Sequence, residues 1–334
     1  MKSHPKISIV TPSFNRGWSI RACIESLQNQ TFVDYEHIII DGGSTDNTLE
    51  ILKEVSLYDS RVKYISEPDD GMYDAVNKGL RMALGDICAY LNTDDFYLPN
   101  TLESVIRRFE TEPELSMIYG HWMSWHPETN FLEILPVLNY TAPDLATFAV
   151  LPQPSVFFRN EVFESLGGFD LSFKLLADND FFSKAAVKGF KFKRIEDYLS
   201  IQTVHSGNLL AGNCESIIQA RQEGIRYRKN RQQELIQSGF KINGLRKTGF
   251  KRIILPIVWR INLILRWSYK SKNTAEFRSE IISSKYSDSS LFLFLRYLFG
   301  RGDRYKFSFN KIDHVTLSNR LKFSVPNVTK SEVS

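Results

Sequence analysis

The sequence contains few cysteines, and their spacing excludes two classes of site. Only three occur among 334 residues, namely Cys23, Cys88 and Cys214, and none forms a C-x-x-C pair. We therefore expect neither a disulfide framework nor a cysteine-ligated zinc site, and a reducing compartment fits best.

Long apolar runs are also lacking. No stretch of about 18 uninterrupted apolar residues occurs, so we expect no conventional membrane-spanning helix. The chain enters a predicted strand at Ile7 without the basic and apolar regions of a signal peptide. These absences predict a cytoplasmic protein, and they leave open a peripheral position at the inner face of the plasma membrane.

A strong charge of either sign is absent as well. The formal net charge is +4, which is too small to predict a nucleic-acid partner. With 43% hydrophobic and 24% charged residues, the composition is that of a globular protein with an ample core. The charge is uneven, however, because the chain is basic and poor in acids from Arg221 onward.

Short apolar runs alternate with helical patterns through the first part of the chain. Strands are predicted over 7–11, 37–40, 62–66 and 87–91, and helices over 19–30, 47–55 and 74–84. This alternation with short loops predicts an α/β fold, a Rossmann-like and mainly parallel sheet flanked by helices. Such sheets bind ligands beyond the carboxyl ends of their strands, where the polar clusters of this sequence fall.

The later part of the chain predicts a strand and longer helices, followed by a second region. The strand is predicted over 151–159, and the helices over 160–166, 178–188 and 214–238. Turn residues near 238–246 divide the chain into a first domain, 1–240, in which the polar clusters lie, and a basic, helical C-terminal extension, 241–334. Basic and apolar residues over 245–272 fit the surface of an anionic membrane. Packing on the catalytic domain or on a second subunit is the alternative, and the oligomeric state is open.

Two adjacent carboxylates, Asp94 and Asp95, follow the fourth predicted strand. Their mutual repulsion is costly unless a positive charge compensates it. A divalent cation, Mg²⁺ or Mn²⁺, would do so while it bridges a diphosphate, because both ions prefer oxygen ligands. The structural alternative is that one of the pair caps a helix.

Polar residues also follow the first two predicted strands. Asp41, with Gly42 and Gly43 behind it, could accept hydrogen bonds from a base or a ribose, and the glycines permit a close approach. The loop after the first strand offers hydroxyls, backbone amides and a guanidinium near phosphate. Its candidate donor-binding residues are Thr11, Pro12, Ser13, Asn15 and Arg16. Ordinary turns and helix caps are the competing interpretation.

The stretch 67–79 is unusually polar for a connection that leads into a well-formed helix. Asp74 or Asn77 could face the donor sugar from the start of that helix, and Lys78 could approach phosphate. Acids that favour the helix dipole would explain Asp74 without a function, but not the whole arrangement.

Five motifs in register resemble the inverting family-two glycosyltransferases, which have the GT-A fold. The resemblance spans roughly residues 6–215, and its motifs read TPSFNR, IDGGSTDNT, SEPDDGMYDAVNKG, LNTDD, and LPQPSVFFR with LADNDFF. The resemblance implies a sugar transferase of the hexosyl or N-acetylhexosaminyl type, similar to enzymes of bacterial surface-polysaccharide assembly. A nucleotide-sugar donor and a glycan or lipid-linked glycan acceptor are implied with it.

The resemblance also implies roles for single residues. Asp41 would contact the nucleotide base, and the segment 11–16 would line the same pocket. Asn77, Lys78 and Gly79 would shape the donor site. Asp94 and Asp95 would be the D-x-D-like pair, with Asp95 the better candidate for direct metal ligation.

Inversion by direct displacement also requires a carboxylate that takes the proton of the acceptor hydroxyl. Asp178 matches the base position of the family's Glu-Asp-x-Asp segment, although Ala177 replaces the preceding glutamate. Asp180 is the second candidate, and a helix cap is the alternative role of Asp178. Inversion and the base are therefore expectations drawn from the family.

Three further features of the sequence give weaker indications of function. His205 lies in a Ser/Gly-containing loop and could ligate the metal or contact phosphate, but a lone loop histidine usually does neither. Gln153 could border the acceptor pocket. Trp122 and Trp125 could stack on a sugar, although packing in the core is the favoured role.

Two other function classes compete with the transferase. A nucleotidyltransferase that makes sugar nucleotides shares the sheet, but its Gly-rich, basic phosphate loop is not reproduced by TPSFNRG. A non-catalytic sugar-nucleotide-binding protein would not need both the acidic pair and Asp178. The transferase, with a UDP-sugar favoured as donor, is the predicted function.

Overall fold

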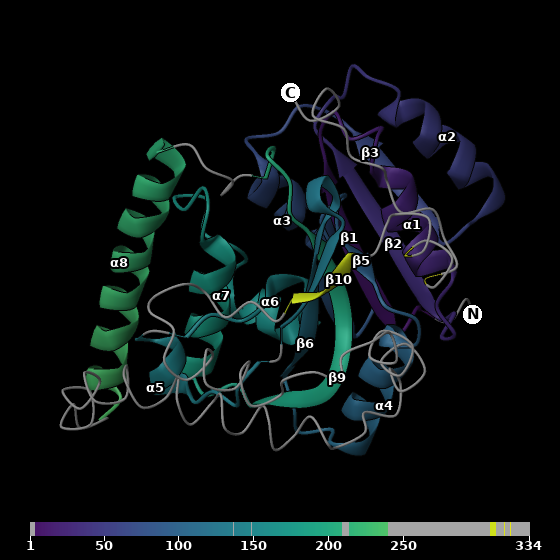
Figure 1. The fold of residues 1–334 in the computed structure, drawn as a ribbon. Coiled ribbons are helices and arrows are strands. Elements are labelled where there is room, and N and C mark those ends of the chain that lie inside the picture. The colour runs from purple at the N-terminus through teal and green to yellow at the C-terminus, as the bar shows by residue number, and fades with distance from the viewer. Residues whose placement is uncertain are drawn as a thin grey trace, which may run out of the picture.

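The computed structural model describes residues 4–135, 137–147, 149–208, 214–239 and 308–311, together with positions 317 and 321. It is a layered α/β structure in which α8 lies beside α7 at one end, while α1 and α2 lie at the other (Figure 1). The strands are β1 (Ile7–Ser13), β2 (Tyr35–Asp41), β3 (Val62–Ser66), β4 (Ile87–Tyr90), β5 (Phe96–Tyr97), β6 (Met117–His126), β7 (Phe131–Leu135), β8 (Val156–Arg159), β9 (Phe192–Thr203) and β10 (Ser308–Lys311). The α-helices are α1 (Ile20–Gln28), α2 (Thr48–Tyr58), α3 (Met72–Met82), α4 (Thr101–Thr111), α5 (Ala142–Leu145), α6 (Asn160–Leu166), α7 (Ala177–Val187) and α8 (Cys214–Gln237).

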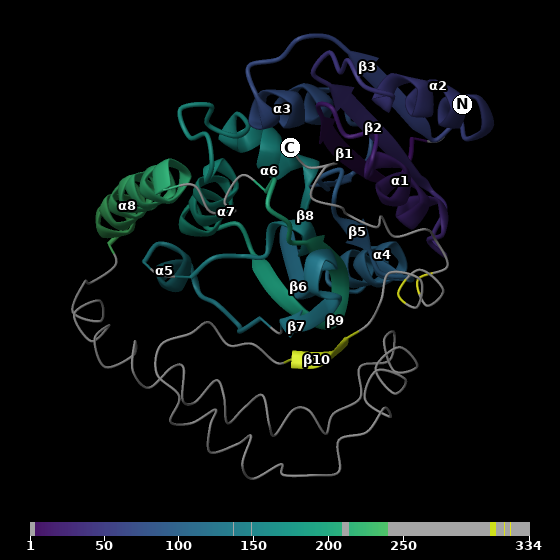
Figure 2. The ribbon, with the colours of Figure 1, turned by 45° about the horizontal axis from the view of Figure 1, so that its top comes forward.

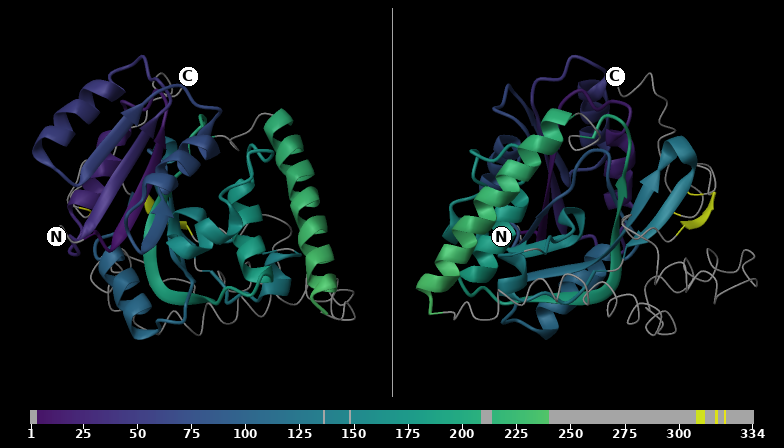
Figure 3. Two further views of the ribbon diagram at one scale, coloured as in Figure 1. Left: turned by 180° about the vertical axis from the view of Figure 1, so that it is seen from behind. Right: turned by 60° about the vertical axis from the view of Figure 1, so that its left-hand side comes forward.

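The described strands form one sheet in the order β10-β7-β6-β8-β4-β1-β2-β3. The strands β4, β1, β2 and β3 are parallel to one another, which places their carboxyl ends at one edge. Pairing becomes antiparallel at β8 and continues so through β6, β7 and β10. The strand β9 pairs parallel with β6 and antiparallel with β5, and it curves strongly along its length (Figure 3).

Alternating side chains of the parallel strands bury themselves against helices on both faces of the sheet. Ile7 and Ile9 pack toward α1 and α4, whereas Val10 packs toward α3. Ile38 and Ile40 likewise contact the α3 side. Because both faces are covered, these strands read as nearly continuous apolar runs. The predicted α/β architecture, a sheet flanked by helices, is confirmed.

The predicted elements of the first part of the chain all occur, with ends shifted by a few residues. The third strand, Val62–Ser66, and the helix Asn160–Leu166 match their predicted bounds. Helix α4 and strand β9 were not predicted, and β9 alternates charged and apolar residues only in part. Trp125 is fully buried, as the packing interpretation predicted, and Trp122 packs partly buried against the core.

Pieces of the C-terminal region return to the sheet. The strand β10 pairs with β7, beside which it lies in Figure 2. Leu317 and Leu321 are buried in the cluster that contains Trp125 and Phe96. Residues 241–307, and with them the proposed membrane-contacting stretch 245–272, lie outside the described residues, so the division at 240 stays a prediction. Within the described ranges, every helix is too short or too polar to cross a lipid bilayer.

Candidate active site

Asp94 forms a close contact with a residue far along the chain. Its Oδ2 lies 2.9 Å from His205 Nε2, and it also accepts a hydrogen bond from Asn208 Nδ2 at 3.1 Å. Trp18 packs edge-on against the His205 ring, with 5.1 Å between the ring centroids. The structure therefore brings together Asp94 and His205, the two weaker of the three predicted metal ligands.

Asp95 points to a different set of partners. Its Oδ1 accepts the backbone N–H of Thr203 at 3.0 Å, and its Oδ2 lies 3.4 Å from Asn92 Nδ2. Burial, followed by the neighbouring charge of Asp94, raises the pKa of Asp95 well above its ordinary value. A nearby cation would relieve this cost, which is the electrostatic situation expected of a metal site.

The fit to a cation rests on oxygen atoms that have no partner of their own. Within the described part of the chain, no three His, Cys, Asp or Glu side chains form a ready metal cluster. Asn92 Oδ1 and Thr203 Oγ1 are nevertheless buried beside Asp95 without a hydrogen-bond partner among the described residues. Carboxylate, amide and hydroxyl oxygens with one imidazole nitrogen suit Mg²⁺ or Mn²⁺ when diphosphate oxygens complete the shell.

Asp178 lies in the first turn of α7 and is partly exposed. Its Oδ1 accepts hydrogen bonds from Asn179 N at 2.7 Å, Asn179 Nδ2 at 3.2 Å and Tyr73 Oη at 3.2 Å. All three of these donors bind Oδ1 and none of them binds Oδ2. Desolvation raises the pKa of Asp178 to about 6, although the hydrogen bonds oppose the shift. The N-cap position of α7 is occupied by Leu176, so Asp178 is not the N-cap of this helix.

Helix α8 fixes the start of α7. The carboxylate of Glu223 accepts the backbone N–H groups of Lys174, Leu175 and Leu176 at 2.9–3.0 Å. Arg231 lies 3.5 Å from Asp180, and both side chains are 6% exposed. Asp180 is therefore enclosed in a buried ion pair, whereas Asp178 is partly exposed, and the choice of base stays a prediction.

The carboxylate of Asp41 shapes the loop that follows β2. Its Oδ2 accepts the N–H groups of Gly43 and Ser44 and the hydroxyl of Ser66, and its Oδ1 accepts the hydroxyl of Ser44. Asp41 is fully buried. Contact with a nucleotide base would require one of these bonds to be exchanged, and that contact stays a prediction.

In the segment 11–16, the first three residues are buried, whereas Asn15 and Arg16 are partly exposed. Thr11 is buried, with Oγ1 2.8 Å from His37 Nε2, while Pro12 is buried beside it. Ser13 Oγ is buried and has no hydrogen-bond partner among the described residues, and it is level with Asp41 in the sheet. Asn15 accepts the N–H of Thr45 at 2.8 Å and takes a left-handed conformation, with φ 50°. Arg16 is partly exposed near these groups.

The residues predicted on α3 act on its surroundings in different ways. Asn77 binds the backbone of Phe169 twice, with Nδ2 2.8 Å from the carbonyl oxygen and Oδ1 2.9 Å from the amide nitrogen. Asp74 forms an ion pair with Lys78 at 3.3 Å, and Lys78 also reaches Glu67. A Cβ at Gly79 would lie 2.4 Å from a methyl group of Val10, so only glycine lets α3 lie this close to the sheet. Asn77 and Gly79 thus shape this region through the backbone.

Four residues of the site were not singled out by sequence reasoning, namely Tyr73, Thr203, Asn208 and Glu223. Tyr73 lies inside the recognised GMYDAVNKG motif, so its position was a signal. Thr203 binds Asp95 through its backbone amide, which any residue could supply. Glu223 lies 45 positions after Asp178, and no local pattern relates the two.

The chain matches a known family over its first half. Residues 8–163 match the profile described as glycosyl transferase family 2. A Mycobacterium tuberculosis protein named as an uncharacterized glycosyltransferase is 30% identical over 189 residues, which cover 56% of this chain and 71% of that protein. The chain belongs to glycosyl transferase family 2. The resemblance drawn from the motifs, and the enzyme class, are thereby confirmed.

Other relatives of this family-2 glycosyltransferase are larger polysaccharide synthases. A chondroitin synthase of Pasteurella multocida is 27% identical over 216 residues, which cover 64% of this chain but 22% of the synthase. A hyaluronan synthase of Pasteurella multocida is 28% identical over 208 residues, which cover 61% of this chain and 21% of the synthase. The chain therefore spans about a fifth of the length of these relatives.

Solved structures support the fold. A mannosyltransferase from Pyrobaculum calidifontis, in complex with GDP-Man and Mn²⁺, superposes with a TM-score of 0.53 at 15% identity and covers 89% of this chain and 86% of that chain. Staphylococcus aureus TarS superposes with a TM-score of 0.51 at 17% identity, and the match covers 74% of each chain. At these identities the likeness shows the shared GT-A architecture alone.

Proposed function

We propose that this family-2 glycosyltransferase moves a sugar from a nucleoside diphosphate, with UDP favoured, to an acceptor hydroxyl with inversion at the anomeric carbon. The observation that carries the proposal is the carboxylate of Asp178. Three donors fix its Oδ1, and none of the three binds its Oδ2. A single-step displacement needs one such oriented base on the acceptor side.

The base works by taking the proton of the acceptor hydroxyl onto Oδ2. As that proton leaves, the acceptor oxygen bonds to the anomeric carbon, and the bond from this carbon to the diphosphate oxygen breaks. A pKa of about 6 keeps Asp178 ionised at neutral pH and still basic enough to accept a proton. The anchored Oδ1 keeps the carboxylate from rotating away from the acceptor.

Asp94, Asp95 and His205 would hold the divalent cation, with Asn92 Oδ1 as a further oxygen donor. The cation, when bound, supplies Lewis-acid neutralisation of the charge on the leaving diphosphate. His205 Nε2 and Asp94 Oδ2 already lie 2.9 Å apart, so little side-chain movement is needed to place both on one ion. The Mn²⁺ named with the Pyrobaculum mannosyltransferase is consistent with this choice of metal.

The donor would lie along the carboxyl edge of β1, β2 and β4. The loop shaped by Asp41 would receive the base, and Ser13 Oγ, which lacks a partner among the described residues, would donate to the nucleotide. Arg16 and Lys78 would supply positive charge toward the phosphates. Asp74 would keep Lys78 in place through their ion pair.

The acceptor class follows from the relatives and stays a proposal. The synthases that resemble this chain are named for chondroitin and hyaluronan, which are polysaccharides. We therefore infer a glycan acceptor, either a growing polysaccharide or a lipid-linked precursor. A cytoplasmic enzyme in peripheral contact with an anionic membrane through residues 245–272 would suit the lipid-linked form.

A donor panel tests the proposal. UDP-, GDP- and dTDP-sugars are screened with Mn²⁺ for a rise in the thermal midpoint, since a ligand that binds the folded state stabilises it by mass action. The stabilising donor is then assayed with glycan acceptors for release of nucleoside diphosphate. Release of pyrophosphate from a nucleoside triphosphate and a sugar phosphate would instead establish a nucleotidyltransferase.

The variant Asp178→Asn separates binding from chemistry. We expect it to keep the donor-induced thermal shift and to lose turnover by on the order of a hundredfold or more. Full turnover in this variant would overturn the assignment of the base. Binding without turnover in the wild-type protein, across the whole panel, would favour a sugar-nucleotide-binding protein.

A further inference from the structure

Tyr73 places its hydroxyl at the base from a helix that belongs to the donor side of the site. It lies in the first turn of α3 and is 4% exposed. Its Oη is 3.2 Å from Asp178 Oδ1 and 3.1 Å from the carbonyl oxygen of Leu175. Leu175 lies just before α7 and Asp178 lies in its first turn, so the single proton of this hydroxyl is shared between the base and the loop before it.

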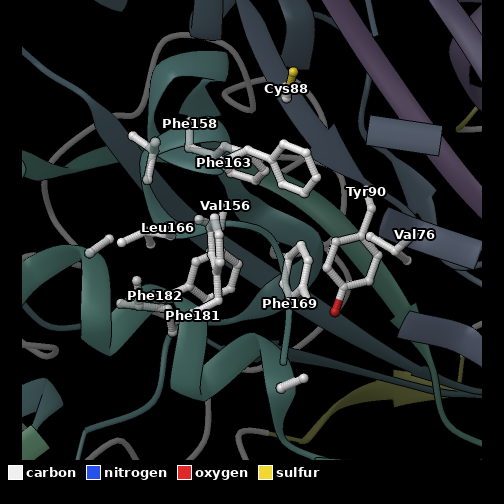
Figure 4. Close-up of a cluster of buried hydrophobic side chains, with 14 of the residues drawn as sticks. Val76, Cys88, Tyr90, Val156, Phe158, Phe163, Leu166, Phe169, Phe181 and Phe182 are labelled. Carbon is white, nitrogen blue, oxygen red and sulfur yellow. The ribbon is translucent and has the colours of Figure 1, made fainter. Parts of the chain in front are cut away.

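The ring of Tyr73 is fixed by its packing. It stacks on Phe169, with 5.8 Å between centroids and 16° between planes. Phe169 lies between Phe181 and Tyr90, as Figure 4 shows, with centroid distances of 4.4 Å and 5.5 Å. Such packing restricts the ring to one orientation, and the hydroxyl cannot swing away from Asp178 without disturbing the core.

Tyr90 extends the connection to the acidic pair. It is the last residue of β4, the strand that leads into Asp94 and Asp95, and its hydroxyl is hydrogen-bonded to that of Tyr73. The amide of Gln153 holds the backbone carbonyl of Tyr90 at 2.6 Å. A continuous set of contacts therefore joins the end of β4 to the carboxylate on α7.

We propose that Tyr73 is a positioning residue that holds Oδ1 of Asp178 and so directs Oδ2 toward the acceptor, at a fixed separation from the acidic pair. The inference rests on the proposed function, in which Asp178 is the base. The positioning depends on a hydrogen bond that the Tyr73 hydroxyl, which stays protonated, donates to the ionised carboxylate of Asp178. Burial raises the pKa of Tyr73 well above its ordinary value, which keeps the phenol a donor.

The hydrogen bond has a measurable consequence for titration. A donor to the ionised carboxylate lowers its pKa, so removal of the Tyr73 hydroxyl must raise the pKa of Asp178. The variant Tyr73→Phe keeps the stacked ring and removes only the oxygen. We expect the titration midpoint of Asp178 to rise by about half a unit to one unit in this variant.

The experiment is a ¹³C NMR titration of aspartate-labelled protein without substrate. The carboxyl signal of Asp178 is assigned by its loss in Asp178→Asn, and its midpoint is compared between wild type and Tyr73→Phe. Tyr35→Phe is the matched control, because the buried hydroxyl of Tyr35 has no hydrogen-bond partner among the described residues. Tyr35 also lies at the amino end of β2, whereas the site lies at the carboxyl edge of the sheet. If Tyr73→Phe does not fold, Tyr90→Phe should raise the midpoint in the same direction by a smaller amount.

The outcomes separate this inference from the function itself. A raised midpoint together with a lower kcat at an unchanged donor KM supports the positioning role. An unchanged midpoint and an unchanged kcat overturn it, even where Asp178→Asn abolishes turnover and the base assignment stands. If Asp178→Asn turns over normally, the base assignment fails, and the positioning role fails with it whatever the midpoint shows.

Discussion

His205 Nε2 lies 2.9 Å from Asp94 Oδ2, which joins the loop after β9 to the loop after β4. The pair is screened from water, because the His205 side chain is fully buried and that of Asp94 is 12% exposed. Asn208 reaches the same carboxylate oxygen, so the loop after β9 supplies two groups to one atom. A metal ligand and the group that orients it commonly lie in this relationship.

Replacement of His205 by alanine should weaken metal binding. We expect the Mn²⁺ affinity measured with UDP present to fall by roughly ten- to a hundredfold, since a ligand or its orienting partner is lost. Isothermal titration of both proteins checks the prediction, and His4→Ala, at an exposed position, is the control. Equal affinities in the His205 variant would remove this residue from the metal site.

Asp178→Asn should raise the stability of the protein at neutral pH. The folded-state pKa of about 6 lies above the ordinary value of 3.8, so folding favours the neutral form. The free energy of unfolding of the wild-type protein therefore falls as the pH rises from about 3.8, where Asp178 ionises in the unfolded chain, to about 6, where it ionises in the folded protein. We expect a higher thermal midpoint for the variant at neutral pH and no difference in acid. An equal or lower midpoint at neutral pH would argue against a desolvated carboxylate.

Turnover by the wild-type enzyme should fall in mild acid. Asp178 accepts a proton only when ionised, so kcat/KM should rise with pH up to a midpoint of about 6 and level off above it. The profile is measured with saturating Mn²⁺, so that metal binding does not limit the rate at any pH. A rate that stays constant through this range would contradict the assignment of the base.

Asn77→Ala should destabilise the protein through the backbone of Phe169. The change leaves a buried amide and a buried carbonyl without their partners, and we expect a loss of about 2–4 kcal/mol in unfolding free energy. Chemical denaturation checks the value, with Asn230→Ala at an exposed position of α8 as the control. A loss no larger than that of the control would show that the amide does not hold this loop.

Leu317→Ala tests whether the C-terminal region is part of the catalytic fold. Leu317 is fully buried against the cluster that contains Trp125, so we expect a loss of about 2–5 kcal/mol. A single unfolding transition that moves to lower denaturant would show that the two parts unfold together. A second, separate transition would instead support two domains divided near residue 240.

The sequence predicted the parallel half of the sheet well because local signals defined it. Apolar runs ended by Pro12, Asp41 and Asn92 marked the strands and their carboxyl ends, and short loops left few alternative topologies. The antiparallel half was harder, because β9 owes its length to pairing with both β6 and β5 rather than to its own residues. Tertiary pairing of this kind leaves little trace in a single strand.

Site residues were predictable as types but not as partners. The acidic pair and Asp178 stood out as carboxylates after strands or at helix starts. That His205 contacts Asp94 rather than Asp95, and that Asn77 holds a backbone loop, depended on side-chain directions. Glu223 was missed because it acts on amides that lie some fifty positions earlier, and nothing local marks that distance.

The burial of Leu317 and Leu321 beside Trp125 has a consequence for biosynthesis. A ribosome that has made the whole parallel sheet has not yet supplied the side chains that cover this aromatic residue. Nascent chains therefore keep an apolar surface open until translation nears position 321, and chaperones or neighbouring chains meet that surface first. Synthesis of residues 317 and 321, more than completion of the parallel strands, therefore determines when this apolar surface is covered.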